Sequence, residues 1–85
     1  MIASPGNREY LCSSGRIEIA VQTEKQWHAL AVCLGRPELA YEGAWEAVRQ
    51  SPPDGEVAQV LAETFGEDPA GVWAERLKAH AVPYR

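Results

Sequence analysis

With 85 residues, 46% of them hydrophobic, the chain can form one globular domain with a modest core; it is too short for a second domain and too apolar for a disordered chain. Its net charge of −4 and the lack of any run of Lys or Arg argue against binding to nucleic acid or to an anionic membrane surface. No apolar run approaches the roughly 20 residues of a membrane span, and the N-terminus has no secretory signal pattern, so we expect a cytoplasmic protein.

The N-terminal part is expected to form a linker and a β-hairpin. Residues 1–8 mix Pro, Gly, Ser and Asn without periodicity, which predicts a flexible, loosely held N-terminal linker. Residues 9–12 and 16–22 flank the short turn Ser-Ser-Gly. In the second of these segments apolar residues alternate with polar ones, at Ile17, Ile19 and Val21. This alternation predicts an antiparallel hairpin with one covered face.

The next segment carries start and stop signals for a helix. Thr23 and Gln26 have the spacing of a capping box, in which side chains bond the free backbone N–H groups of the first turn. An apolar stripe at helical spacing follows, formed by Trp27, Leu30, Ala31 and Leu34. Gly35 can adopt the left-handed conformation that ends a helix, and Pro37 can begin a new short turn. We therefore predict a helix from Thr23 to Leu34.

Two further helices are predicted in the middle of the chain. A short one spans residues 42–50, where Trp45 and Val48 have helical spacing, and ends before the Ser-Pro-Pro sequence at residue 51. The second begins with Asp54 as N-cap and ends at Gly66. Its apolar stripe consists of Val57, Val60, Leu61 and Phe65.

A last helix is predicted after Asp68-Pro69, with Asp68 as the cap and Pro69 at the first helical position. It carries Val72, Trp73 and Leu77, and must end before Val82-Pro83, because the residue before a proline is pushed out of the α region. The predicted fold class is therefore α+β, with a β-hairpin or small antiparallel sheet covered by three to four α-helices.

The sequence shows no arrangement that indicates catalysis or metal binding. His28 and His80 belong to no ligand spacing, and we interpret them as surface histidines. Cys12 and Cys33 lack motif spacing and are interpreted as two reduced, partly buried thiols. We therefore predict no catalytic residue and no metal ligand in this chain.

Tryptophans and two arginines are the remaining candidates for ligand contacts. Each tryptophan lies in an apolar helical stripe without basic neighbours, so the core is the favoured interpretation for all three: Trp27, Trp45 and Trp73. Arg36 and Arg49 each stand near a predicted helix end, where an anionic ligand could be shared with backbone groups. The alternative, a solvated arginine or one that caps a helix C-terminus, stays open for both.

Several motifs occur in an order that resembles one family. They are Ala-Val-Gln-Thr followed by Gln-Trp, then Leu-Gly-Arg-Pro-Glu-Leu at residues 34–39, then Trp73, Leu77 and Val82-Pro83. Over about residues 9–83 the chain resembles the small domain of the family III CoA-transferases of the CaiB/BaiF type, which include formyl-CoA and carnitine CoA-transferases and α-methylacyl-CoA racemases. Two features depart from that family: Ala81 stands where it usually has Gly, and residues 1–10 show no glycine-rich loop.

The resemblance implies a function for residues 9–85 as part of a larger enzyme. In the family, the small domain closes the acyl-CoA cleft against a large Rossmann-like domain that carries the catalytic groups, within an interlocked homodimer. The chain by itself would then be inactive and bind no cofactor tightly, the coenzyme A thioester being the substrate of the parent enzyme, with Arg36 and Arg49 as candidate contacts. The alternative is a stand-alone, non-catalytic interaction module with the same fold. Transferase and racemase activity, and the acyl group, are left open.

Overall fold

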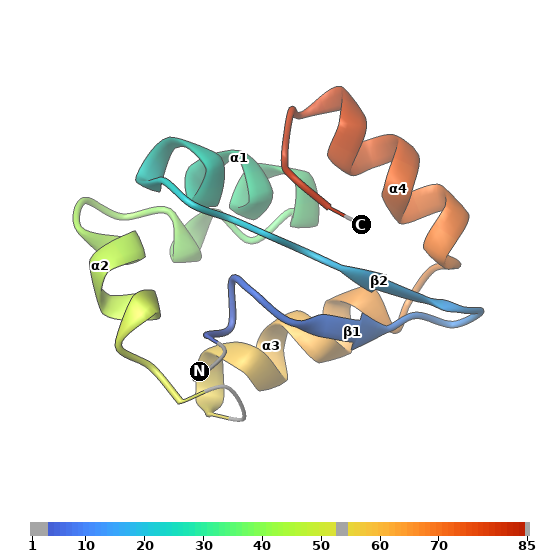
Figure 1. Ribbon diagram of the computed structural model, residues 1–85, viewed down its shortest axis with the longest axis horizontal. Helices are drawn as coiled ribbons and strands as arrows, with labels where there is room; N and C mark the ends of the chain where they lie inside the picture. Colours follow the sequence, from blue (N-terminus) through green and yellow to red (C-terminus); the bar gives the residue numbers. More distant parts are fainter. Residues whose placement is uncertain (1–3, 53–54, 85) are drawn as a thin grey trace.

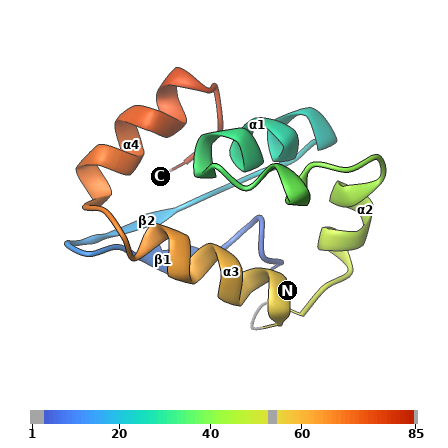
Figure 2. The same cartoon turned by 180° about the vertical axis from the view of Figure 1, so that it is seen from behind.

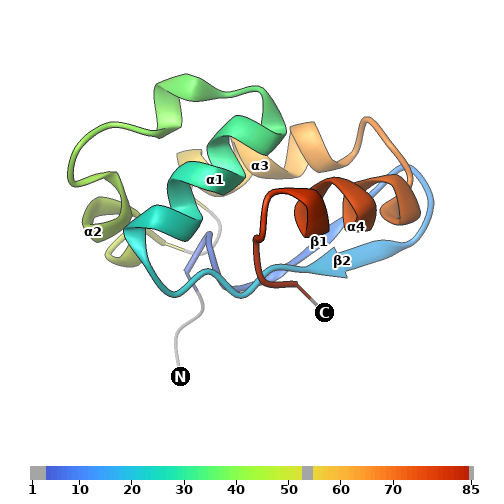
Figure 3. The same cartoon turned by 90° about the horizontal axis from the view of Figure 1, so that it is seen from above.

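Residues 4–52 and 55–84 are described by the computed structural model, and they form the predicted α+β fold (Figure 1). Within this part of the chain, a two-stranded antiparallel sheet is accompanied by four α-helices and one short 3-10 helix. The helices α1 (Glu24–Leu34) and α4 (Ala70–Ala79) lie side by side when the molecule is seen from above (Figure 3). Helix α3 (Glu56–Phe65) contacts strand β1 (Glu9–Leu11), and α4 contacts strand β2 (Arg16–Glu18), so helices cover one face of the sheet.

The hairpin consists of β1 (Glu9–Leu11) and β2 (Arg16–Glu18), with Tyr10 paired to Ile17. Gly15 adopts a φ of 78° in the turn and accepts a hydrogen bond from the Cys12 amide at 2.9 Å. The inward face is buried as predicted: Tyr10, Ile17, Ile19 and Val21 are at most 3% exposed. The regular strands are shorter than predicted, because the chain beyond Glu18 pairs with other segments instead of with β1 alone.

The N-terminal segment is one of these partners. The Ile19 amide donates to the Arg8 carbonyl at 3.1 Å, and the Val21 amide donates to the Gly6 carbonyl at 2.9 Å. Pro5 and Gly6 are buried. Residues 1–3 of the predicted linker lie outside the described residues, whereas residues 4–8 are packed against the core and are not a loose linker.

The C-terminal segment lies along the opposite edge of the same extended stretch. The Ala20 amide donates to the Pro83 carbonyl at 3.0 Å, and Ile19 forms an antiparallel bridge with Tyr84. Residues 19–21 are therefore held between two segments that are more than 60 positions apart in the sequence. No local pattern in residues 16–22 indicates either partner.

Helix α1 (Glu24–Leu34) begins and ends as predicted. The Thr23 hydroxyl accepts from the Gln26 amide at 3.2 Å, while the Gln26 side chain accepts from the Gln22 amide at 2.7 Å, one residue before the cap. Gly35 takes the left-handed conformation with a φ of 70°, and Pro37 opens the 3-10 helix η1 (Pro37–Leu39). The predicted stripe is the buried one: Trp27, Leu30, Ala31 and Leu34.

The next two helices are present, but the bounds of α2 and the buried residues of α3 differ in part from the prediction. Helix α2 (Ala44–Arg49) lies within the predicted range and buries Trp45 and Val48. Helix α3 (Glu56–Phe65) follows Gly55, and the expected cap, Asp54, lies outside the described residues. Its buried stripe is Ala58, Leu61, Thr64 and Phe65, whereas Val57 and Val60 are only half-buried.

The start of helix α4 (Ala70–Ala79) differs from the prediction. Pro69 occupies the N-cap position and no side chain caps the helix, so Asp68 as the cap was wrong. The Asp68 carboxylate instead accepts a hydrogen bond from Arg76 Nη1 at 2.9 Å, and its carbonyl accepts from the Ser13 amide at 3.0 Å. The hairpin turn supplies a partner for the first turn of α4 in place of a cap: the Ala70 amide donates to the Ser14 carbonyl at 2.9 Å.

The end of α4 carries the clearest backbone feature of the chain. The Val82 amide donates to the Leu77 carbonyl at 2.9 Å and the Ala81 amide to the Lys78 carbonyl at 3.1 Å, which is the Schellman pattern. This pattern places Ala81 in the left-handed region, with a φ of 58°. The position is one that glycine occupies without strain, in keeping with the glycine found there in the family that the sequence resembles.

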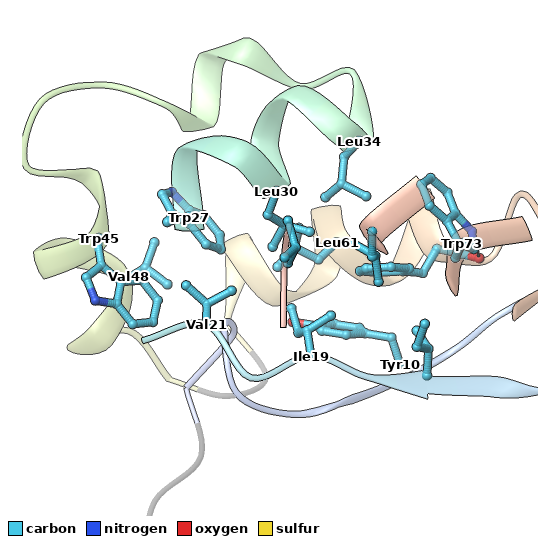
Figure 4. Packing of buried hydrophobic residues seen from close by; sticks show 14 of the residues in the cluster. Tyr10, Ile19, Val21, Trp27, Leu30, Leu34, Trp45, Val48, Leu61 and Trp73 are labelled. Atoms are coloured by element: carbon cyan, nitrogen blue, oxygen red, sulfur yellow. Dashed lines mark hydrogen bonds between the residues drawn. The ribbon is translucent and has the colours of Figure 1, made fainter. Parts of the chain in front are cut away.

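Aromatic residues form two groups in the core (Figure 4). In one, the Phe65 ring is stacked on Tyr10 and meets Trp73 edge-on, both at 5.1 Å between ring centroids. In the other, Trp27 stacks on Trp45 at 6.0 Å. Both groups belong to one buried cluster, which also includes Leu30, Leu61 and Leu77.

Candidate functional site

Arg36 lies two residues after Leu34, the last residue of α1, at the carboxyl end of that helix. Its backbone amide donates to the Ala31 carbonyl at 2.9 Å as part of the helix stop, so it is not free to bind an anion. The side chain turns toward α3, where Nε donates to the Thr64 hydroxyl at 3.3 Å. Nη1 lies 3.8 Å from the Glu38 carboxylate, and 36% of the side chain is exposed. The guanidinium is thus anchored at one nitrogen and accessible at its outer face.

Thr64 is the residue of this arrangement that the sequence did not reveal. It is 4% exposed, accepts the bond from Arg36 and donates its own hydroxyl proton to the Val60 carbonyl at 2.9 Å. Its position three residues after Leu61 and beside Phe65, on the buried side of α3, was the available signal. Which arginine it would meet, 28 positions earlier in the chain, was not readable from any local pattern.

Arg49 is the last residue of α2 and has a different environment. Its Nη1 lies 3.1 Å from the Glu46 carboxylate, which also accepts from the Gln50 amide group at 3.1 Å. The side chain is 58% exposed, so this ion pair contributes little to stability. Arg49 and Arg36 contact different carboxylates and share no partner in these bonds.

Both arginines stand at carboxyl ends of helices, where backbone carbonyls and the negative end of the macrodipole are found. This is the geometry of a cation that complements a helix C-terminus, one of the two interpretations that the sequence left open. Anion sites that use backbone N–H groups belong to the amino ends of helices. A phosphate bound at Arg36 or Arg49 would therefore rely mainly on the guanidinium group, although Arg36 is also the N-cap residue of the short 3-10 helix η1.

The two histidines lie in different parts of the fold, on α1 and at the end of α4. His28 Nε2 lies 3.2 Å from the Tyr41 carbonyl and 4.0 Å from the Glu24 carboxylate, and connects α1 with the loop before α2. His80 is the exposed C-cap residue of α4. Among residues 4–52 and 55–84, no group of three or more His, Cys, Asp or Glu side chains is placed to hold a metal ion.

Both cysteines are free and half-buried, as the sequence predicted. Burial raises the pKa of the Cys12 thiol. Burial also raises the pKa of Cys33, although Arg76 acts in the opposite direction. Because the thiolate is the nucleophilic form, these environments favour the unreactive, protonated thiols.

The three tryptophans are core residues, as predicted. Trp27, Trp45 and Trp73 are 1%, 7% and 3% exposed. Two of the indole N–H groups donate to backbone carbonyls, from Trp27 to Leu39 and from Trp73 to Phe65, at 2.8 and 2.9 Å. The large apolar side chains that remain accessible are elsewhere: the most exposed are Leu11, Val32 and Tyr41, at 72%, 60% and 54%.

Comparison with known proteins gives the class of domain that this α+β fold represents. The sequence model of CoA-transferase family III matches residues 2–85. The chain therefore belongs to CoA-transferase family III, as its motifs had indicated. A search of curated proteins gave no match. In the described part of the chain, none of the helices has the length and apolar character needed to cross a membrane.

Proposed function

We propose that this chain is the small domain of a family III enzyme that acts on acyl-CoA thioesters as a transferase or a racemase. In this proposal it closes the acyl-CoA cleft against a large Rossmann-like domain of the same enzyme. The observation that carries the proposal is the family match over residues 2–85. An interlocked homodimer and a cytoplasmic location belong to the same proposal, and the homodimer rests on the resemblance to the family.

The side chains of the described residues are suited to contact and not to bond-making. Covalent catalysis needs a nucleophile within hydrogen-bonding reach of a base. Burial raises the pKa of the half-buried Cys12 and Cys33 thiols and so disfavours their thiolates, and the polar partners of His28 are a backbone carbonyl and a carboxylate. The proposal therefore assigns the chemistry to groups outside residues 4–52 and 55–84.

Arg36 is the better candidate of the two arginines for a coenzyme A phosphate. The bond from its Nε to the buried Thr64 hydroxyl fixes the direction of the side chain, so less conformational entropy is lost when a ligand binds. Arg49 has no such anchor and pairs with Glu46 on an exposed helix. Val32, four residues before Arg36, and Tyr41 offer exposed apolar area on the same stretch, α1 to the loop before α2. We propose that this stretch faces the large domain.

Titration of coenzyme A into the isotope-labelled 85-residue chain tests the ligand contacts. In this proposal the chain carries only part of the coenzyme A site, the rest being on the large domain. We therefore expect a dissociation constant for coenzyme A on the order of 1 mM or weaker, no more than about 4 kcal/mol of binding free energy. Resonance shifts should centre on Arg36 and Thr64. Arg36→Gln should abolish them and Arg49→Gln should leave them in place. Saturation at micromolar ligand would contradict this partial site and indicate a binding module in its own right.

Activity measurements test the role of the domain. We expect no acyl-CoA turnover by the purified chain, and turnover when it is combined with the Rossmann-like domain encoded with it. If the chain alone shows turnover, a double variant, His28→Ala with His80→Ala, is the control. Equal turnover in this variant would indicate a contaminant. Turnover lost in that variant would contradict the proposal. A folded chain that binds neither a Rossmann-like partner nor coenzyme A would favour the stand-alone interaction module.

A further inference from the structure

Helix α2 is attached to the rest of the molecule through few side chains. It has six residues, and its buried members are Ala44, Trp45 and Val48. It lies at the end of the molecule opposite the hairpin tip (Figure 2), and its main neighbour among the helices is α1, through the stacking of Trp45 on Trp27. A helix of this length is not stable by itself in water, so these contacts decide whether it exists.

A second contact of Trp45 comes from the N-terminal segment, residues 4–7. A Cβ atom added to Gly6 would lie 2.5 Å from Cζ3 and 2.9 Å from Cη2 of Trp45, and 3.5 Å from Val21 Cβ. The backbone of Gly6 therefore lies directly against the outer edge of the indole ring. No other residue type fits at this position unless the ring moves.

The N-terminal segment is itself held firmly to the core. Its carbonyl groups accept hydrogen bonds from the Val21 amide, at Gly6, and from the buried Tyr10 hydroxyl, at Pro5, at 2.9 and 2.5 Å. The Asn7 side chain donates to the Val21 carbonyl at 2.7 Å. Residues 4–7 thus contact both Val21, in the extended stretch after β2, and Trp45 of α2.

We infer that residues 4–7 act as a latch for α2: the contact with Gly6 keeps Trp45 in its buried position. Displacing residues 4–7 lets α2 separate from the core as a unit, which we call the open form. The group of Tyr10, Phe65 and Trp73 contains no α2 residue, so these rings keep their mutual contacts in the open form, although the Tyr10 hydroxyl loses its bond to the Pro5 carbonyl. Local opening of such weakly attached units is a general property of native proteins. Arg49 ends α2 and moves with it. The inference does not depend on the proposed function.

Amide hydrogen exchange of the 85-residue chain tests the latch. Gly6→Ala places a methyl group against Trp45 and should raise the exchange rates of Ala47 and Gln50, whose amides bond to Gly43 and Ala47, by about tenfold or more. The amides of Trp73 and His80 in α4 should change by less than about twofold. Gly71→Ala is the matched control, because its added Cβ meets nothing within 4 Å, and it should leave α2 exchange unchanged.

A rescue variant separates the latch from general destabilisation. Trp45→Phe removes the part of the ring that Gly6 contacts, so adding Gly6→Ala in this background should change α2 exchange by less than about twofold. Equal increases in α2 and α4 would overturn the inference, since they would show one cooperative unit. So would a Gly6→Ala chain that does not fold, unchanged α2 exchange in that variant, or a full Gly6→Ala effect in the Trp45→Phe background.

Discussion

The two aromatic groups of the core each contain tryptophan but are held in different ways. Phe65 connects Tyr10 and Trp73 across β1, α3 and α4, and the Trp73 indole donates to the Phe65 carbonyl at 2.9 Å. Trp45 has Trp27 on one side and the backbone of Gly6 on another, and lies on a six-residue helix. The burial of the two indoles is similar, at 3% and 7% exposed.

Burial alone is therefore a poor guide to what a tryptophan stabilises. Trp73 joins two helices of ten residues each to the hairpin, so its loss is expected to affect the whole domain. Trp45 holds one short helix, and its loss can be confined to that helix. The following predictions test this contrast, in order of decreasing effect.

The largest effect is expected for Trp73→Ala. The substitution removes the edge contact with Phe65, the buried hydrogen bond of the indole and the ring beneath the Arg76 guanidinium. The free energy of unfolding should fall by about 3–5 kcal/mol, as for other large-to-small changes in a core. Chemical denaturation followed by circular dichroism measures this. A loss below about 1 kcal/mol would show that this group does not hold the domain together.

Trp45→Ala should cost less, about 3 kcal/mol or below, at the low end of the range for such changes. The reason is that α2 can detach from the core. The cost of the cavity left by the indole is therefore limited by the free energy that holds α2 in its packed position. Backbone chemical shifts should show residues 44–49 losing helicity while residues 70–79 keep it. Equal destabilisation by the two tryptophan variants, with both helices lost together, would remove the contrast.

A pH-dependent effect is expected from Tyr10. Burial raises the pKa of its phenol well above the ordinary value, although Arg8 acts in the opposite direction. The folded state therefore favours the neutral phenol, whereas the unfolded chain ionises it at about pH 10. This contribution to stability is present below that pH and lost as pH rises further, by up to about 1.4 kcal/mol per pH unit.

Denaturation midpoints between pH 8 and pH 11.5 measure this slope. Tyr10→Phe should show a flatter dependence than the original chain, whatever its absolute stability. Tyr84→Phe, at a residue that is 36% exposed, is the control and should keep the slope. Identical slopes in the original chain and Tyr10→Phe would mean that Tyr10 is accessible to water in the folded state.

The smallest effect is a gain in stability. Ala81→Gly relieves the left-handed φ of 58° that ends α4, and should raise the free energy of unfolding by about 1 kcal/mol. Ala79→Gly, two residues earlier and still within the helix, should lower it by about 1 kcal/mol or less. Thermal or chemical denaturation distinguishes the two signs. A loss of stability in Ala81→Gly would indicate that the gain in chain entropy of the unfolded state outweighs the strain.

The elements that the sequence predicted well are those with a local cause. The cap of α1 at Thr23 and its stop at Gly35 depend on backbone groups within a few residues, so their spacing is visible in the sequence. The covered face of the hairpin follows from alternation alone, since successive side chains of a strand point to opposite faces. The core positions of the tryptophans follow in the same way from helical periodicity.

The candidate site was predicted only in part. The positions of Arg36 and Arg49 near helix ends were correct, and their contact with coenzyme A stays a prediction. The anchor of Arg36 at Thr64 came from the tertiary structure, because the two residues are 28 positions apart and meet only when the segment after α1 lies against α3. Side chains that bond across such distances leave no spacing by which they can be recognised.

Length, charge, helix stops, hairpin alternation and family membership were thus determined by the sequence itself. Only the tertiary structure decided that Asp68 bonds Arg76 instead of capping α4, that Gly6 lies against Trp45, and that residues 19–21 are held between both ends of the described chain. The physical reason is competition. A local preference such as a cap is worth about 1 kcal/mol. Backbone bonds to a distant segment, such as that from the Ala70 amide to the Ser14 carbonyl, can replace it, because the packing that brings the segments together is fixed by the burial of the whole core.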